Sequence, residues 1–306
     1  MKLTSGLRVA VLRGGPSREY KDSLKTGEHI LTSLRAMPGY DPMDIFISKS
    51  GEWHREGLVF EPHRALEHVD VVWNALHGAF GEDGQVQRIF ETLKIPFTGS
   101  GVTASALSMN KEMAKNIYRD NGLPTPEHVF LTEENFDDKD LLYIFQNFMH
   151  PVVIKPANAT GSLGVRTAGT FQELSKVVKE TFRHYRRVIV EECVEGDEVS
   201  CVVLEGLNGE KIFAFEPIRL ETKKRARRLN REENERIQEM AKQAHEMLGL
   251  RHYSNSDFII TPKRNIYILE TNALPMLHRG STLNKSLLEK GLHHNDFVDH
   301  VLKLVV

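Results

Sequence analysis

The sequence is poor in cysteine and has no long apolar run. Its 306 residues include two cysteines, Cys193 and Cys201, without Cys-x-x-Cys or Cys/His ligand spacing. We therefore expect neither a disulfide scaffold nor a zinc site, and each cysteine is predicted to be a small core residue. No apolar stretch approaches the length that spans a bilayer. The N-terminal segment runs straight into a strand pattern, so we expect a cytoplasmic protein without a signal peptide or membrane partner.

A large excess of charge of either sign is also absent. The 40 lysines and arginines nearly balance the 42 aspartates and glutamates. This balance provides no basic footprint for a polyanion, so nucleic acid is not an expected partner. The length indicates two or three domain-sized units with a sizeable core.

The most informative pattern is a β-hairpin in the last quarter of the chain. Two arms rich in β-branched and aromatic residues, 257–260 and 266–272, flank a polar turn that carries a proline. If the turn centres between Lys263 and Arg264, the numbers of facing residues sum to 527. Asp257 then lies opposite Glu270.

The hairpin predicts a metal site. Asn272 points to the same face as Asp257 and Glu270, and two opposed carboxylates at an apolar end call for a positive group between them. Three oxygen ligands suit a hard cation, and magnesium fits best because it completes its shell with water and nucleotide phosphates. The alternative is a solvated hairpin mouth whose carboxylates never meet.

The first third of the chain has the pattern of an open α/β sheet. Ligands gather at the carboxyl ends of the strands in such sheets. Strands are predicted at 7–12, 45–47 and 69–76, and residues 22–37 have helical spacing.

Two polar residues follow these strands. Glu19 is either a carboxylate in the first turn of the helix or a group that holds a cationic substrate amine. His77, with the glycines after it, leaves a titratable ring and backbone amides at the edge of the sheet. The alternative for His77 is a glycine-rich connection with a histidine that satisfies a turn.

Two lysines of the middle third stand where phosphate could bind. Lys111 lies on a helix predicted to run from the glycine-rich stretch near residue 100 to about residue 120. Lys155 ends a strand and begins a loop of small residues, whose amides can cradle phosphate oxygens beside the ammonium group. The alternative is a flexible hairpin loop with a solvated lysine.

A strand at 188–194 turns polar towards its end, and Glu198 begins another strand four residues later. Such a segment can bond an adenine edge through its backbone and hold a ribose hydroxyl with Glu198. The alternative, which is more common for such a pattern, is an edge strand with exposed acidic side chains.

Taken in order, these segments resemble the ATP-grasp ligases, most closely the D-alanine:D-alanine ligases. The matching segments span residues 14–281 and include TGSGVTASALSMNK and the hairpin DFIITPKRNIYILETNALP. The resemblance implies an α/β fold, with a substrate-binding domain over residues 1–99. It also implies an ATP-grasp module over 100–306, α+β in character, with lobes at about 100–187 and 188–306.

The resemblance implies a role for each candidate residue. In the ATP site, Lys111 and Lys155 would hold the phosphates, and Ser162 and Gly164 would lie in the flap over them. Glu191, Glu192 and Val194 would line the adenine pocket, and Glu198 would hold the ribose. The metal ligands would be Asp257, Glu270 and Asn272. Glu19 would bind the amine of the first D-alanine with His77 nearby, and Ser281 would lie by the carboxylate of the second. Glu19, Ser162 and Ser281 would form the catalytic set.

The implied reaction is ATP-dependent formation of a D-alanine dipeptide through an acylphosphate, for peptidoglycan synthesis. The implied cofactor is Mg²⁺ or Mn²⁺, the partners are the small molecules ATP and D-alanine, and a homodimer is left open. Two alternatives are an ATP-grasp ligase with another amino-acid or hydroxy-acid acceptor, and a catalytically weak ATP-binding homologue.

The sequence departs from the family pattern at four places. Gly161 stands where the family has a flap serine, although Ser162 follows at once. Asn255 and Met276 replace an arginine and a glycine that ordinarily steady the oxyanion of the tetrahedral intermediate. The long loop that carries a catalytic tyrosine and lysine is replaced by a short basic run at 223–228. We interpret this run as a solvated surface, and the alternative is that it supplies the phosphate-binding cation lost with the loop.

Overall fold

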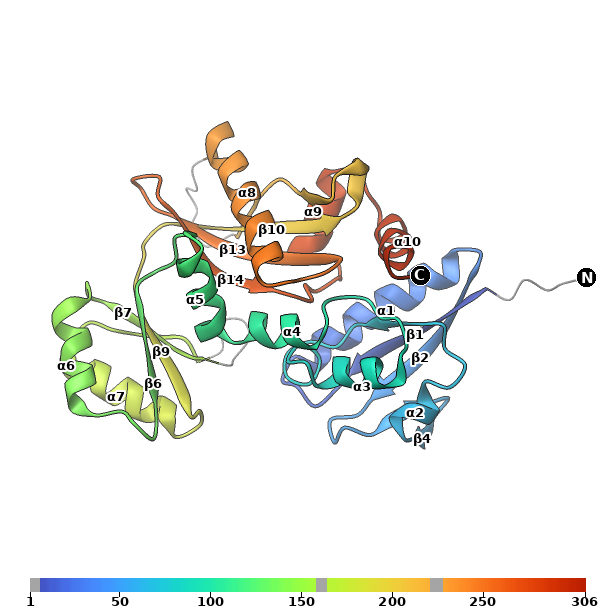
Figure 1. Cartoon of the computed structure of the whole chain (residues 1–306), viewed down its shortest axis with the longest axis horizontal. Coiled ribbons are helices and arrows are strands. Elements are labelled where there is room, and N and C mark those ends of the chain that lie inside the picture. The colour runs from blue at the N-terminus through green and yellow to red at the C-terminus, as the bar shows by residue number, and fades with distance from the viewer. Residues whose placement is uncertain (1–5, 158–163, 221–227) are drawn as a thin grey trace, which may run out of the picture.

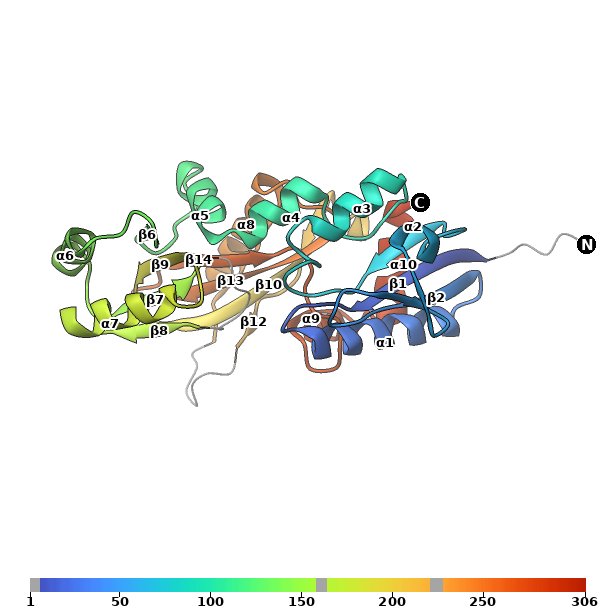
Figure 2. The same ribbon diagram turned by 90° about the horizontal axis from the view of Figure 1, so that it is seen from below.

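The computed structural model describes residues 6–157, 164–220 and 228–306. Within these ranges, three β-sheets follow one another along an elongated molecule, each with helices packed against it (Figures 1 and 2). The N-terminal sheet lies at one end, the sheet of the middle segment at the other, and the third sheet between them. Gly161, Ser162 and most of the basic run lie outside the described residues.

The N-terminal sheet is the expected open α/β sheet. Its elements are β1 (Leu7–Gly14), β2 (Tyr40–Ile47), β3 (Trp53–Arg55), β4 (Leu58–Phe60), β5 (Val71–Asn74), α1 (Tyr20–Ala36), α2 (Pro62–Ala65) and α3 (Gln85–Leu93). β1 pairs in parallel with β2 and β5, whereas β3 and β4 form an antiparallel edge. Successive residues of β1 face opposite sides, so that Val9 and Val11 pack with α1, and Ala10 and Leu12 pack with α2 and α3.

The single helix predicted to run to about residue 120 is two helices, α4 (Val102–Met109) and α5 (Lys111–Asp120). Asn110 separates them: its backbone is extended, and its Oδ1 accepts hydrogen bonds from the N–H groups of Glu112 and Met113 at 3.1 and 3.3 Å. Asparagine is a preferred N-cap because its side chain satisfies amides that a helix start leaves open. The prediction of one continuous helix is therefore wrong, and α5 begins at Lys111.

The second sheet consists of β6 (His128–Thr132), β9 (Arg187–Glu192), β7 (Val152–Pro156) and β8 (Arg166–Ala168), in that order and all antiparallel. The helices α6 (Asp138–Asn147) and α7 (Phe171–Phe182) pack together on one of its faces. Val152 and Ile154 of β7 point into that core. By the alternation of a strand, Lys155 and its neighbour Glu191 point to the other face.

The third sheet has the order β11-β10-β13-β14, with β12 paired to β10. Its elements are β10 (Asp197–Glu205), β11 (Ile212–Ala214), β12 (Ile218–Arg219), β13 (Tyr253–Ile260) and β14 (Ile266–Asn272), with a 3-10 turn at Leu207–Gly209. The helix α8 (Arg231–Met247) packs on this sheet.

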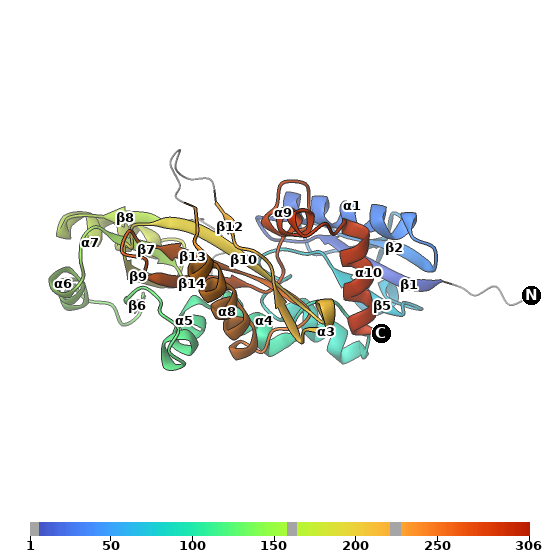
Figure 3. The ribbon, with the colours of Figure 1, turned by 90° about the horizontal axis from the view of Figure 1, so that it is seen from above.

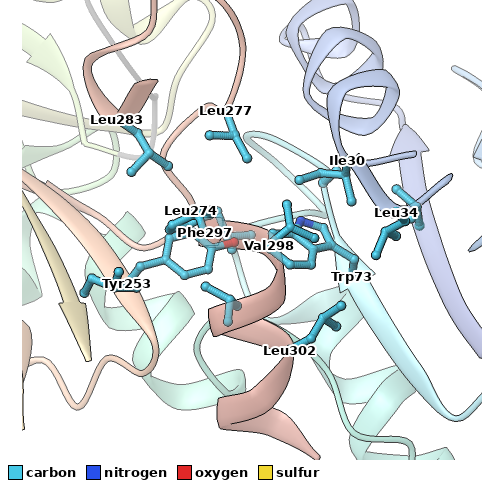
Figure 4. Packing of buried hydrophobic residues seen from close by; sticks show 14 of the residues in the cluster. Ile30, Leu34, Trp73, Tyr253, Leu274, Leu277, Leu283, Phe297, Val298 and Leu302 are labelled. Atoms are coloured by element: carbon cyan, nitrogen blue, oxygen red, sulfur yellow. The ribbon is translucent and has the colours of Figure 1, made fainter. Parts of the chain in front are cut away.

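The first and third sheets share one hydrophobic core (Figure 4). The chain ends in α9 (Thr282–Glu289) and α10 (His294–Val305). Phe297 of α10 contacts Trp73 of β5 and Tyr253 of β13, with ring centroids 6.2 and 5.3 Å apart. Tyr40 Oη also donates to Asp299 Oδ1 at 2.7 Å, and α10 lies beside α1 (Figure 3). The last helix of the chain therefore packs with the N-terminal sheet.

The predicted division of the chain at residue 99 stays a prediction. Within the described ranges, no helix is long and apolar enough to cross a membrane.

Candidate active site

The hairpin of β13 and β14 places Asp257 opposite Glu270, as the sequence predicts. The register is not uniform, because Ile260 pairs with Ile266 near the turn, and the numbers of this pair sum to 526 rather than 527. A β-bulge that takes up Leu269 makes up the difference. The predicted register is therefore correct at the carboxylate end and wrong by one residue near the turn.

Asp257 has polar neighbours that favour its ionised form. Its Oδ1 lies 2.5 Å from Ser200 Oγ and accepts a hydrogen bond from Asn255 Nδ2 at 3.2 Å. Even so, burial and the nearby Glu270 carboxylate raise the pKa of Asp257 to about 7. A cation beside both carboxylates would oppose this rise.

The donor set fits a divalent cation that is completed by a nucleotide. Among the described residues, no group of three or more histidines, cysteines, aspartates and glutamates could hold a metal by itself. Magnesium is commonly held by one or two carboxylates together with water and phosphates, and Asp257 and Glu270 supply two. Asn272 Oδ1 already accepts from the Leu274 N–H at 2.8 Å, although a carbonyl oxygen has a second lone pair. The metal roles of these three residues stay predictions.

The cation found beside the carboxylate pair is a lysine. Lys111, the first residue of α5, donates from Nζ to Glu270 Oε2 at 2.6 Å. The Lys111 side chain is 10% exposed and that of Glu270 33%, so the pair lies at the edge of solvent. Lys111 therefore pairs with Glu270, and the predicted metal between the two carboxylates stays a prediction.

A second set of charges lies on β9. Glu191 Oε2 accepts from Lys155 Nζ at 2.8 Å, and Glu191 Oε1 lies 3.4 Å from Lys115 Nζ. Glu191 and Lys115 are each 1% exposed. Burial would raise the pKa of Glu191, but the two lysines lower it overall. Burial lowers the pKa of Lys115 to about 8, opposed by the attraction of Glu191.

A cleft of about 320 Å³ lies beside these groups, between the second and third sheets. Its lining includes the predicted nucleotide residues Lys155, Glu191, Glu192, Val194 and Glu198, together with Asp257 and Glu270. A larger hollow of about 690 Å³, over β2 and β3, contains none of the predicted site residues.

Cys193 also lines the cleft and is partly exposed, so the prediction that it is a core residue is wrong. It follows the last residue of β9, where the chain passes along the cleft instead of continuing into the core. Cys201 is fully buried, as predicted.

The residues predicted to bind the amino-acid substrates lie near the ends of β1 and β5. Glu19 directly precedes α1, and a Cβ added at Gly78 would lie 3.1 Å from Glu19 Oε2, so the two loops are adjacent. His77 is 2% exposed. Its Nε2 lies 2.9 Å from Thr26 Oγ1 and its Nδ1 3.5 Å from Glu82 Oε1. His77 is therefore a buried residue that links α1 to the loop after β5.

Ser281 is attached to the same region from the C-terminal side. The loop before it docks on α1 through the Leu277 N–H, which donates to Thr26 Oγ1 at 3.3 Å. Ser281 is the N-cap of α9, and its Oγ accepts from the Asn284 N–H at 3.2 Å. Thr26 of α1 thus contacts both His77 and the loop that precedes Ser281.

Of the two predicted flap residues, Gly164 is described and Ser162 is not. Gly164 has φ +74°, and a Cβ there would lie 2.9 Å from Pro156 Cγ. Both the backbone conformation and the close approach of Pro156 favour glycine.

Sequence reasoning missed Lys115 and Ser200. Lys115 lies one helical turn after Lys111, and Ser200 lies two residues after Glu198 on the same strand. These spacings could have indicated a shared face. The spacings become informative only once Glu191 is known to contact Lys115 and Asp257 to contact Ser200.

Two antiparallel sheets around a cleft that is lined by a carboxylate pair and Lys155 define the class of ATP-grasp enzymes. The sequence matches the family described as D-ala D-ala ligase N-terminus over residues 55–100 and that described as D-ala D-ala ligase C-terminus over residues 117–303. The chain belongs to the D-alanine–D-alanine ligase family, and it is an ATP-dependent ligase of the ATP-grasp type.

Individual relatives agree over the full length. A D-alanine–D-alanine ligase of Geotalea uraniireducens is 35% identical, over 96% of this chain and 94% of its own. The VanG D-Ala:D-Ser ligase of Enterococcus faecalis has a TM-score of 0.88 at 27% identity, covering 98% of this chain and 100% of its own. The D-alanine–D-alanine ligase of Bacillus anthracis complexed with ATP has a TM-score of 0.81 at 26% identity, covering 97% and 96%.

Proposed function

We propose that this ligase joins two molecules of D-alanine, with conversion of ATP to ADP and phosphate, and that the dipeptide serves peptidoglycan synthesis. The observation that carries the proposal is the cleft in which Asp257 and Glu270 oppose each other with Lys111 on Glu270. Full-length similarity to a D-alanine–D-alanine ligase supports the choice of substrate.

In the first step, a carboxylate oxygen of the first D-alanine attacks the γ-phosphorus of ATP, and the bond from this phosphorus to the bridging oxygen of ADP breaks. Lys111 and Lys155 leave their carboxylate partners and neutralise the phosphate oxygens. Asp257, Glu270 and Asn272 would hold Mg²⁺ or Mn²⁺, which when bound neutralises charge on the phosphates.

The nucleotide is oriented by the strand that ends at the cleft. Glu192 and Val194, with the backbone of Glu191, line the adenine pocket, and Glu198 holds the ribose. Fixing ATP in this way leaves its terminal phosphate near the carboxylate pair, and such positioning is a main source of rate enhancement in phosphoryl transfer.

In the second step, the amine of the second D-alanine attacks the acyl carbon, phosphate leaves with the bonding electron pair, and the amine proton passes to solvent. Glu19 pairs with the ammonium group of the first D-alanine, with His77 behind it. Ser281 lies by the carboxylate of the second D-alanine, and Gly164 belongs to the cover over the phosphates. The same role is proposed for Ser162, which lies outside the described residues. Catalysis is then mostly positioning and charge neutralisation.

A different acceptor is the second candidate function. Asn255 donates to Asp257 and provides no positive charge where the family has an arginine. Similarity to a protein named as a D-Ala:D-Ser ligase makes D-serine the first alternative acceptor to test. A catalytically weak ATP-binding homologue is the third reading.

One assay separates these readings. Phosphate release from ATP should require D-alanine and exceed the release seen with L-alanine, D-serine or D-lactate as partner substrate. A higher rate with D-alanine plus D-serine or D-lactate favours another acceptor, and release that no amino acid stimulates favours the weak homologue. Cytoplasmic location and a homodimer stay predictions from the sequence.

A further inference from the structure

Lys115 is buried beneath the nucleotide cleft but has no part in the reaction described above. Its Nζ donates to Thr125 Oγ1 at 2.8 Å and lies 3.4 Å from Glu191 Oε1. Thr125 Oγ1 in turn donates to the carbonyl oxygen of Ile268 at 2.9 Å. The ammonium group is therefore fixed between α5, β9 and the segments at Thr125 and β14.

Glu191 faces a conflict when ATP binds. Its nearest cation, Lys155, is also the lysine proposed to bind phosphate. When Lys155 turns to the nucleotide, a carboxylate that is 1% exposed loses its contact of 2.8 Å. An unpaired buried charge is strongly unfavourable. Within the described part of the chain, Glu191 Oε1 has no hydrogen-bond partner, and Lys115 is the cation that remains beside it.

We propose that Lys115 is a positioning residue that keeps Glu191 ionised and in place, so that Lys155 is free to bind the phosphates of ATP. Without Lys115, Glu191 retains Lys155 as its counter-ion, and ATP has to break that pair. The inference rests on the proposed ATP site and is independent of the amino-acid substrates.

The first measurement is Mg-ATP binding without any amino acid, by titration calorimetry. Lys115→Met keeps the volume of the side chain and removes its charge. Loss of a charge-assisted contact to phosphate predicts a Kd for Mg-ATP about tenfold higher. The matched control is Lys211→Met, whose side chain is 85% exposed and paired with Glu246 at 2.9 Å, and which should leave the Kd unchanged.

A double-mutant cycle separates positioning from a simple loss of charge. Lys155→Met should raise the Kd about tenfold in the parent, but less than about threefold in the Lys115→Met background, because Lys155 is already held by Glu191 there. Additive losses would mean that Lys115 acts by its charge alone, and would overturn the proposal. Glu191→Gln, added to Lys115→Met, should restore the Kd to within about threefold of the parent.

Turnover provides a second readout that a merely structural role would not produce. In Lys115→Met, KM for ATP should rise while kcat at saturating ATP stays within about twofold, since only access to Lys155 is impaired. If Lys115→Met fails to fold, Lys115→Gln replaces it in the same cycle.

Two failures can be told apart. A parent protein that does not bind Mg-ATP overturns the proposed function. A parent that binds it, with a folded Lys115→Met variant that binds equally well, overturns only the role of Lys115.

Discussion

Lys111 Nζ and Glu270 Oε2 lie 2.6 Å apart, so the proposed phosphate lysine and the proposed metal ligand neutralise each other before either meets its ligand. Lys155 and Glu191 repeat the arrangement at 2.8 Å. Binding Mg-ATP then exchanges internal ion pairs for contacts with phosphate and metal. Without a ligand, these charges of the site are thus neutralised by one another. The effects expected for the variants below follow from the exchange of these ion pairs.

Asp257→Asn should stabilise the metal-free protein at alkaline pH. The pKa of Asp257 is raised from 3.8 to about 7, so between these values the folded state holds a proton that the unfolded chain has released. This contribution to the free energy of unfolding is present at low pH and is lost as the pH rises through about 7. Melting curves in chelator should show the variant gaining on the parent between about pH 5 and pH 8. A difference in melting temperature between variant and parent that stays constant across this pH range would contradict the raised pKa of Asp257.

The same variant should weaken Mg-ATP binding, as should Glu270→Gln. Each removes a carboxylate from the proposed metal site, and we expect the Kd to rise about tenfold or more with the fold intact. Asp41→Asn, at an exposed position on β2, is the control. If both site variants bind Mg-ATP as tightly as the parent, the metal assignment is wrong.

Lys111→Ala and Lys155→Ala should each raise KM for ATP about tenfold or more, because each removes a charge-assisted contact with phosphate. KM for D-alanine should change far less. Lys211→Ala is the matched exposed control. Unchanged ATP dependence in both variants would return these lysines to a structural or solvated role.

His252 should make the fold sensitive to acid. Its Nδ1 accepts from the Gly99 N–H at 3.0 Å, and burial, with the nearby Arg251, lowers its pKa to about 4. The unfolded chain takes up a proton near pH 6.5 that the folded state refuses, so the free energy of unfolding falls as the pH drops from 6.5 towards 4.

His252→Asn should flatten this decline. Asparagine tolerates the φ of +66° at this position and does not titrate. Chemical denaturation of parent and variant at about pH 7 and pH 5 measures the effect. If parent and variant lose equal free energy of unfolding between these two pH values, His252 is not the source of the acid sensitivity.

Glu19→Gln should weaken capture of the first D-alanine and spare ATP binding. With Gly161 in place of a flap serine and no long loop, fewer groups remain to orient the Glu19 carboxylate, so its role leans towards charge pairing with the amine. D-alanine-dependent phosphate release and Mg-ATP binding are measured side by side, with the exposed Glu239→Gln as control. Parental D-alanine dependence in Glu19→Gln would remove the amine-binding role.

Local patterns were enough to predict much of the fold. Alternation and β-branching along 257–272 predict the hairpin and the facing of Asp257 and Glu270. The bulge at Leu269 was not predicted from the local pattern; beside it, the Ile268 N–H donates to Pro124 O at 2.8 Å, a contact with a segment distant in the sequence. The break at Asn110 did have a local signal, an N-cap residue that the prediction of one long helix overlooked.

The candidate site was predictable as a set of residues but not as a network. Lys111, Lys155 and Glu191 were each named as site residues. Lys155 and Glu191 pair across neighbouring strands of the second sheet, whereas the pair of Lys111 and Glu270 depends on how α5 packs against the third sheet. The structural part of His77 shows the same limit, because its partners Thr26 and Glu82 come from a helix and a loop that no spacing rule connects.

The central claim is that the carboxylate of D-alanine is phosphorylated. The most direct measurement uses D-alanine with ¹⁸O in its carboxylate, and mass spectrometry of the phosphate and dipeptide released with Mg-ATP. Attack of the carboxylate on the γ-phosphorus, followed by attack of the amine, predicts one ¹⁸O in each phosphate and one phosphate for each D-alanine dipeptide. Phosphate without the label, or labelled phosphate without dipeptide, would contradict the account.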